Sequence, residues 1–230
     1  MKCPTLMDSI SLIIPAFNEA PAMRTVLEEI HRFLPTVECI VIDDGSTDGT
    51  GTIAKAMGVR VLMHARRLGS GRSVKDGILA ASNDTIVLMD ADCTYPVERI
   101  PDIVASLERA DMVVGVRQGL EHQESVAKRY ARTILRGIAE RLTGRHIPDV
   151  NSGLRAFRRS SMQKDIPFLC DGFSFMTTIT LAYIFTGRTV QYVPVTYHRR
   201  VGISKVRFPQ DAVRTLIAMM KVAYYYRRTS

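Results

Sequence analysis

The stretch Thr85-Ile86-Val87-Leu88-Met89-Asp90-Ala91-Asp92 decides the fold of this chain. Its first four residues form a short apolar run after the turn-like Ser82-Asn83-Asp84, a pattern typical of a buried strand. Asp90 and Asp92 then place two carboxylates at the carboxyl end of that strand, where an open α/β sheet binds ligands. Such a pair can hold a hard divalent cation together with a diphosphate. The same short pattern is also common in solvated loops, so the rest of the chain has to decide.

The composition is that of a folded protein with an anionic partner. The chain has 230 residues, of which 46% are hydrophobic and 23% charged, enough for one large α/β domain. The formal net charge of +8 favours nucleic acid, a phosphorylated substrate or an anionic membrane surface. No nucleic-acid-binding motif is present, which makes the first of these partners the weakest candidate.

The sequence predicts a protein of a reducing compartment. Its four cysteines show no metal-binding or redox spacing and are expected to be free thiols. No apolar run approaches the roughly 20 residues that span a bilayer, and the first residues lack the pattern of a signal peptide. We therefore expect a cytoplasmic location, either free or peripheral on the cytoplasmic face of the membrane.

In the first half of the chain, predicted strands alternate with predicted helices. The strands are expected at 9–14, 37–42, 60–63 and 85–88, and the helices at 20–33, 50–57 and 73–81. This alternation predicts a parallel, doubly wound sheet, in which Asp44 and the Asp90/Asp92 pair meet at one edge. A dinucleotide-binding fingerprint is not present, because Gly69-Ser70-Gly71 follows the third strand and position 74 is valine.

The second half is less regular and strongly basic. Helices are expected at 96–107, 125–143 and 173–185, strands at 111–116 and 189–195, and a loop from Asp149 to Phe157 that leads into an edge strand. Arg129, Arg132 and Arg136 share one face of the second helix, which is either solvated or directed at phosphate. Residues 197–207 form a basic loop with the capacity to bind anions.

The last helix, expected over 209–226, is amphipathic. One side carries an apolar stripe of Val213, Leu216, Ile217, Met220 and Tyr224. The stripe indicates either a helix that packs on the core or one that lies in a membrane interface, with its cations and tyrosines at headgroup level.

Several motifs, in order, resemble the family 2 glycosyltransferases of the GT-A fold, and among them the dolichyl- or polyprenyl-phosphate mannose synthase-like branch. The resemblance covers residues 9–207 and rests on Ile14-Pro15-Ala16-Phe17-Asn18-Glu19, Ile42-Asp43-Asp44-Gly45-Ser46-Thr47-Asp48-Gly49-Thr50, Gly69-x-Gly71, Asp90-Ala91-Asp92, Val114-Gly115-Val116-Arg117, Asp149-Val150-Asn151-Ser152-Gly153-Leu154-Arg155 and Arg200-Val201-Gly202-Ile203-Ser204-Lys205. Two positions depart from the family pattern: Phe17 replaces a tyrosine, and Cys93-Thr94-Tyr95-Pro96 replaces L-Q-H-P.

This resemblance implies a fold, an activity and a cofactor. The fold would be α/β with a mostly parallel central sheet flanked by helices. Residues 1–207 would form the GT-A domain, and residues 208–230 a helix that belongs to the same domain or contacts the membrane. The enzyme would move a sugar, with inversion, from a GDP- or UDP-sugar to a polyprenyl or dolichyl phosphate, using Mg²⁺ or Mn²⁺. Alternatives are a transferase with a soluble acceptor and a non-catalytic subunit that binds nucleotide-sugar or membrane.

The resemblance also implies roles for individual residues. Asp90 and Asp92 would hold the metal and, with Arg117, carry the catalysis. The donor would contact Pro15, Phe17, Glu19, Ile42, Asp44, Ala91, Arg199, Arg200 and Lys205. The acceptor phosphate would contact Arg117, Arg129, Arg132 and Ser204.

The chemistry of the acceptor decides whether the site needs a base. A lipid monophosphate has a second pKa of about 6 and is already ionised near pH 7, so it needs positioning rather than deprotonation. This agrees with a chain that is rich in arginine and shows no obvious pair of histidine and carboxylate. A hydroxyl acceptor would require a carboxylate base, for which Asp149 is the candidate.

Overall fold

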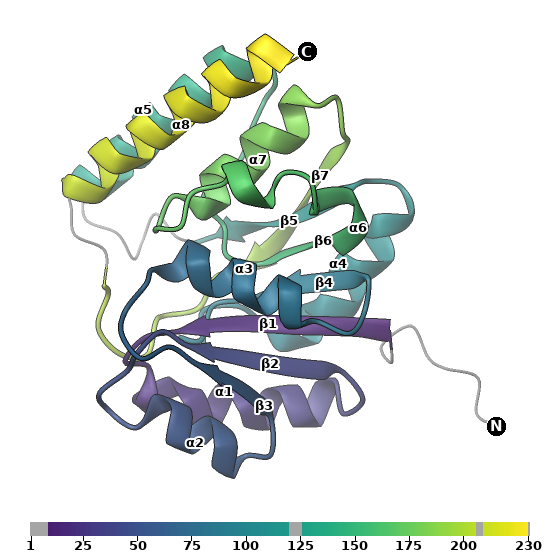
Figure 1. Cartoon of the computed structure of the whole chain (residues 1–230), viewed down its shortest axis with the longest axis vertical. Coiled ribbons are helices and arrows are strands. Elements are labelled where there is room, and N and C mark those ends of the chain that lie inside the picture. The colour runs from purple at the N-terminus through teal and green to yellow at the C-terminus, as the bar shows by residue number, and fades with distance from the viewer. Residues whose placement is uncertain (1–8, 120–125, 206–208, 230) are drawn as a thin grey trace.

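The computed structural model of the chain describes residues 9–119, 126–205 and 209–229. Ser125 and Arg207, which bound two of the predicted segments, lie outside these ranges, as does Cys3. A seven-stranded sheet runs through the described part (Figure 1), in the spatial order β3-β2-β1-β4-β6-β5-β7. In chain order the strands are β1 (Ile10–Ala16), β2 (Glu38–Asp43), β3 (Arg60–Met63), β4 (Thr85–Leu88), β5 (Met112–Gln118), β6 (Arg155–Arg158) and β7 (Val190–Thr196).

Most neighbouring strands are parallel. β3, β2, β1 and β4 run in one direction, and β5 pairs in parallel with β7. β6 alone is antiparallel to its two neighbours, β4 and β5. The prediction of an α/β fold with a mostly parallel sheet is confirmed.

β6 corrects one expectation, because it lies inside the sheet and not at its edge. Arg155 and Phe157 have no exposed surface. The Arg155 guanidinium donates to the carbonyl oxygens of Ser152 and Val150, both at 2.8 Å, and to Thr180 Oγ1 at 2.6 Å. Burial lowers the pKa of Arg155 to about 10. An arginine at each end of a short strand is typical of a strand at the periphery of a sheet. β6 can lie in the centre because the buried guanidinium of Arg155 donates to these carbonyl and hydroxyl oxygens.

Helices cover both faces of the sheet (Figure 1). Neighbouring residues of β1 point to opposite faces, as the strand geometry requires: Leu12 packs in the core beneath α1 and α4, and Ile13 in the core beneath α3 and α7. The helices are α1 (Ala20–Phe33), α2 (Thr50–Ala56), α3 (Ser70–Ala80), α4 (Ile100–Ala105), α5 (Val126–Thr143), α6 (Arg159–Met162), α7 (Phe175–Phe185) and α8 (Gln210–Thr229).

The helix expected over 96–107 is broken into three pieces. Single 3₁₀ turns, Val97–Arg99 and Ser106–Glu108, lie on either side of the short α4. Pro101 stands in the first turn of α4, where its missing N–H costs no helical hydrogen bond. By contrast, the helix over 20–33 and the strands over 60–63 and 85–88 have the predicted bounds.

α8 packs on α7 and lies beside α5, at the periphery of the molecule (Figure 1). Met219 and Val222 face inward and are buried, and Arg227 Nη2 donates to the carbonyl oxygen of Leu142 at 2.7 Å. The stripe recognised in the sequence faces outward instead. Its side chains are 37–63% exposed: Val213, Leu216, Ile217, Met220 and Tyr224. Among the residues the structure describes, no helix is both long and apolar enough to cross a membrane.

Candidate active site

The carboxyl ends of β1 and β2 border a cleft of about 420 Å³. Six of the residues predicted to bind the donor line it: Pro15, Phe17, Glu19, Asp44, Arg200 and Lys205. The remaining lining residues come from the end of β1, from the loop after β3 and the start of α3, from the loop before α7 and from the start of α8: Ala16, Arg67, Leu68, Gly69, Ser70, Ser73, Gly172, Phe173, Asp211 and Arg214. Segments far apart in sequence therefore meet at this end of the sheet.

Asp44 shapes one wall of the cleft. Its carboxylate accepts hydrogen bonds from the backbone N–H groups of Leu68 at 2.7 Å and Gly69 at 2.8 Å. Its Oδ1 also lies 2.8 Å from Nδ1 of His64, whose Nε2 contacts Asp76 Oδ2 at 3.1 Å. This buried pair of histidine and carboxylate was missed from the sequence. His64 directly follows β3, so the rule that strand ends carry the site would have found it.

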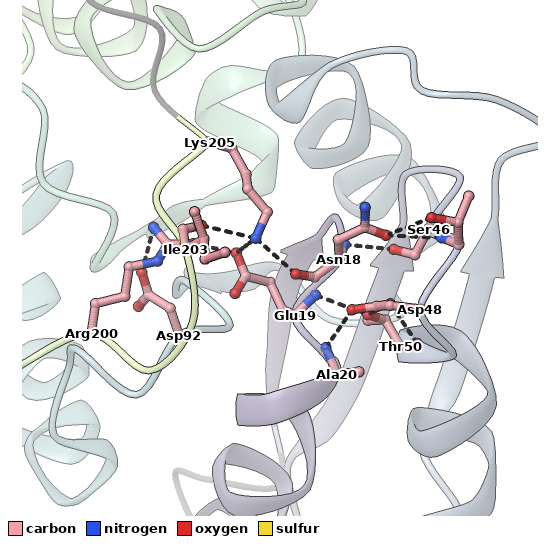
Figure 2. Close-up of polar contacts among 11 residues, drawn as sticks. Asn18, Glu19, Ala20, Ser46, Asp48, Thr50, Asp92, Arg200, Ile203 and Lys205 are labelled. Atoms are coloured by element: carbon pink, nitrogen blue, oxygen red, sulfur yellow. Dashed lines mark hydrogen bonds and ion pairs between the residues drawn. The ribbon is translucent and has the colours of Figure 1, made fainter.

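Phe17 offers an aromatic face to the same cleft. The Arg67 guanidinium lies 4.3 Å from the centre of its ring, a cation–π contact. The next residue, Asn18, has a φ of +54°, a left-handed conformation that asparagine tolerates better than most residues. Asn18 N–H donates to Ser46 Oγ at 2.9 Å, and Asn18 Oδ1 accepts from Thr47 N–H at 2.8 Å (Figure 2). The two loops that follow β1 and β2 are therefore tied together.

Asp90 and Asp92 follow β4, as predicted, but their surroundings differ. Asp92 is buried, and its Oδ1 accepts from Thr94 Oγ1 at 2.5 Å. Asp90 packs against the backbone of Gly153. Among the described residues, no hydrogen bond to the Asp90 carboxylate is found. Burial, and then the charge of Asp92, raise the pKa of Asp90. An unpaired carboxylate of this kind is a suitable ligand for a cation.

Arg200 connects Asp92 to the donor cleft. Its Nη1 lies 3.0 Å from Asp92 Oδ2, and its Nη2 pairs with Glu19 Oε1 (Figure 2). Lys205 Nζ lies 3.5 Å from the same Glu19 oxygen and donates to the carbonyl oxygen of Asn18 at 2.8 Å. Burial raises the pKa of Glu19, against the lowering effect of Arg200 and Lys205. The structure thus brings Asp92, one of the two predicted metal ligands, into an ion-pair network with Glu19 and the basic loop.

Arg117 is engaged in a buried ion pair rather than open to the cleft. Its Nε and Nη2 donate to the two oxygens of Asp149, at 2.7 and 2.8 Å. Despite the cost of burial, the Arg117 charge and its hydrogen bonds hold the pKa of Asp149 below its usual range. Asp149 is therefore an ionised partner of arginine and a poor candidate for a catalytic base.

Three of the arginines of α5 line a second, separate cavity of about 180 Å³. Arg129, Arg132 and Arg136 contribute to it together with Asp149, the partner of Arg117. The Nε atom of Arg136 is buried and has no hydrogen-bond partner. This cavity shares no lining residue with the donor cleft.

Besides Asp90, Asp92 and Arg117, four predicted site residues line neither cavity. Ile42 and Ala91 are buried in the hydrophobic core, on opposite faces of the sheet. Arg199 and Ser204 are exposed on the loop after β7. Neither pair lines the donor cleft or the α5 cavity.

The donor set for a metal consists of the carboxylates of Asp90 and Asp92. Within the described ranges, no group of three or more histidine, cysteine, aspartate or glutamate side chains forms a ready metal site. Two carboxylates suit Mg²⁺ or Mn²⁺, which accept further oxygen ligands from water or from phosphates. The residues present therefore fit a metal that is bound together with a diphosphate.

Comparison with known proteins gives the family. The model of "Glycosyl transferase family 2" matches residues 11–166. The polyprenol monophosphomannose synthase of Mycolicibacterium smegmatis is 29% identical over 215 residues, which cover 85% of this chain and 80% of that protein. The dolichyl-phosphate hexose transferase of Haloferax volcanii is 29% identical, with coverages of 86% and 87%.

Other relatives are longer, and the solved structures are more distant. The undecaprenyl-phosphate 4-deoxy-4-formamido-L-arabinose transferase of Proteus mirabilis is 28% identical over 88% of this chain, which spans only 64% of that protein. Glucosyl-3-phosphoglycerate synthase from Mycobacterium tuberculosis, in complex with Mn²⁺, UDP-glucose and phosphoglyceric acid, superposes with a TM-score of 0.74 at 22% identity, covering 94% of this chain and 80% of that one. This likeness confirms the GT-A fold. Because the family model matches more than half of its length, the chain belongs to the glycosyl transferase family 2.

Proposed function

We propose that this protein transfers a sugar from a nucleoside-diphosphate sugar to a polyprenyl phosphate, with inversion at the anomeric carbon. The donor would occupy the cleft beyond β1 and β2, with its base near Phe17 and its diphosphate near Arg200 and Lys205. The names of the relatives in Mycolicibacterium and Haloferax support a lipid-phosphate acceptor. One observation carries the proposal: the carboxylates of Glu19 and Asp92 and the cations of Arg200 and Lys205 converge at the rim of one cleft.

The reaction would need a divalent cation. Asp90 and Asp92 would hold Mg²⁺ or Mn²⁺, and that cation would supply positive charge to the departing diphosphate. Arg200 and Lys205 would add fixed charges on the same side. No proton transfer to the leaving group is required, because a nucleoside diphosphate leaves as an anion.

The acceptor side of the site favours a phosphate over a hydroxyl. Arg129 and Arg132 line the α5 cavity, where we place the acceptor phosphate. Arg117 does not line this cavity, but it donates to Asp149, which does. A hydroxyl acceptor would need a free carboxylate base, and Asp149 is occupied by Arg117. An ionised phosphate monoester needs only to be held in place.

An exposed apolar surface supports a membrane-bound acceptor. α8, with its outward stripe, lies beside α5, whose Val126, Tyr130 and Ile134 are each at least 60% exposed. Arg129, Arg214, Lys221, Arg227 and Arg228 are exposed on the same two helices. Apolar side chains bordered by cations are typical of helices that lie in the interface of an anionic membrane. We call this surface the α5/α8 face and propose that it contacts the cytoplasmic leaflet.

The start of α8 connects this face to the donor. Asp211 and Arg214, in its first turns, line the donor cleft. We therefore propose that α8 is part of the same domain as the rest of the chain, so that docking on a membrane brings the cleft next to lipid phosphate. The packing of α8 on α7 supports this assignment.

Donor turnover tests the proposal. The protein is incubated with Mn²⁺, undecaprenyl phosphate and a panel of UDP- and GDP-sugars, and release of nucleoside diphosphate is followed, with Asp92→Ala as the control. Release that needs both the lipid phosphate and Asp92 is the expected result and names the sugar. Release that needs Asp92 but not the lipid points to a soluble acceptor or to hydrolysis. Nucleotide binding without release from any donor points to a non-catalytic subunit.

A further inference from the structure

Arg200 neutralises the carboxylates around the proposed metal site. Its Nη2 donates to Glu19 and its Nη1 forms an ion pair with Asp92 (Figure 2), two acids that are 73 residues apart in the sequence. Both acids are buried, with exposed side-chain fractions of 5% and 7%, whereas the Arg200 side chain is 28% exposed. The arginine therefore bridges two buried charges from the cleft side.

Both carboxylate oxygens of Asp92 already have a partner in this arrangement. Oδ1 accepts from the side chain of Thr94 at 2.5 Å, and Oδ2 forms an ion pair with Arg200 at 3.0 Å. A metal that binds Asp92 brings two positive charges next to these partners. Arg200 is the one that a dication repels, while the neutral hydroxyl of Thr94 can stay and orient the carboxylate.

The loop that carries Arg200 is held by other contacts as well. Val201 N–H donates to the carbonyl oxygen of Asp92 at 3.0 Å, and Lys205 Nζ donates to the carbonyl oxygen of Asn18 at 2.8 Å. These bonds do not involve the Arg200 side chain. The guanidinium can therefore leave Asp92 while the loop remains over the cleft.

We infer that Arg200 is the counter-ion of the metal site in the metal-free protein, and that the metal displaces it from Asp92 and leaves it on Glu19. This inference rests on the proposed function. Glu19 is then a positioning residue: it keeps the released guanidinium at the cleft, which Arg200 lines, where the donor diphosphate would bind. Binding of the metal and binding of the diphosphate are coupled, because the one releases the cation that the other uses.

Mn²⁺ binding without nucleotide tests the displacement. Binding to the whole protein is measured from the electron paramagnetic resonance signal of free Mn²⁺, for the wild type, Arg200→Ala and Lys205→Ala. Lys205 is the matched control, since it contacts Glu19 and makes no described contact with Asp92. We expect Arg200→Ala to bind Mn²⁺ about fivefold more tightly or better, as loss of a competing positive charge implies, and Lys205→Ala to stay within about twofold.

The outcomes separate displacement from general repulsion and from failure of the proposed function. Equal affinities of the wild type and Arg200→Ala overturn the inference, and so does an equal gain in Lys205→Ala. If the wild type binds no Mn²⁺ even with UDP or GDP present, the metal site of the proposed function fails together with the inference.

A second variant covers the case in which Arg200→Ala does not fold. Arg200→Gln removes the charge but keeps a long side chain, and it should also bind Mn²⁺ about fivefold more tightly than the wild type. An affinity equal to that of the wild type overturns the inference.

Discussion

A β-carbon added to Gly153 would stand 2.3 Å from Oδ2 of Asp90, so the loop before β6 fits against this carboxylate only as glycine. The loop is fixed in that place by Tyr95, whose hydroxyl accepts from Gly153 N–H at 2.7 Å and lies 3.1 Å from Ser152 Oγ. The position of Asp90 is therefore set from outside its own strand.

Gly153→Ala should displace Asp90 and reduce activity by about a hundredfold, the effect expected of a 1 Å misplacement. The measurement is kcat for donor turnover, together with Mn²⁺ affinity, which should fall as well. Gly137→Ala is the control, because a β-carbon there meets no atom within 4 Å. That helical substitution should keep activity and raise stability by about 0.5–1 kcal/mol. Normal turnover in Gly153→Ala would show that Asp90 tolerates the shift.

Asp149→Asn should destabilise the protein by about 3 kcal/mol, because it leaves the buried Arg117 charge without a counter-charge. Chemical denaturation at pH 7 measures the loss. Asp102→Asn is the matched control: its pair with Arg99 has a similar distance of 2.8 Å, but the two side chains are 57% and 45% exposed. Its removal should cost less than 1 kcal/mol, as is usual for surface pairs. Similar losses in both variants would mean that the Arg117–Asp149 pair contributes no more than a surface contact.

The same pair predicts a dependence on pH. The pKa of Asp149 in the folded protein lies below its ordinary value of about 3.9. Its contribution to stability is therefore fully present above that ordinary value and is lost as the pH falls through the folded pKa. As the pH falls below about 3.9, the melting temperature of the wild type should therefore fall more steeply than that of Asp149→Asn. Parallel curves would contradict this assignment.

His64→Ala should weaken donor binding more than catalysis. The contact between His64 and Asp44 supports the wall formed by Leu68 and Gly69, and a hydrogen bond of this kind contributes about 1 kcal/mol. We expect the KM for the donor to rise about fivefold and kcat to change less than about twofold. His64→Gln, which keeps a donor group, should restore part of the affinity. A fall in kcat at unchanged KM would instead place His64 in the chemistry.

Acidic substitutions on the α5/α8 face should release the protein from membranes. Ile217→Asp combined with Met220→Asp removes two half-exposed apolar side chains and adds negative charge. Partition onto vesicles of phosphatidylglycerol and phosphatidylcholine, measured by flotation, should fall at least about tenfold. Leu79→Asp on α3, where the side chain is 65% exposed, is the control and should leave partition nearly unchanged. Equal losses in both would indicate a general charge effect.

The strands and their ends could be predicted from sequence because each is a local pattern. The apolar run at 85–88 and the acids that follow it identify both β4 and the position of Asp90 and Asp92. The cleft residues Pro15, Phe17 and Asp44 follow from the same rule for neighbouring strands. Which side chains pair with one another across long stretches of sequence could not be predicted. Nothing local indicates that Arg200 bonds to Asp92, 108 residues earlier, or that Arg117 is committed to Asp149.

Two further differences have physical causes. β6 lies inside the sheet although an arginine stands at each of its ends, because Arg155 finds its acceptors in the chain's own carbonyl groups. α8 is apolar on more than one side, so the period of its pattern identifies a stripe without telling which stripe is buried. Met219 faces the core, and Met220 faces out.

The position of β6 next to β5 also bears on how this enzyme could be re-engineered. The chain leaves the sheet after Gln118 and returns at Arg155 beside the same strand, with Gly115 N–H bonded to the carbonyl oxygen of Leu154 at 2.9 Å. The part of this excursion that holds α5 could therefore be exchanged without changing the strand order, provided that Asp149 and Gly153 are kept. Replacing this segment with the corresponding segment of a relative would change the residues proposed to bind the acceptor, while the residues proposed to bind the nucleotide stay those of this chain.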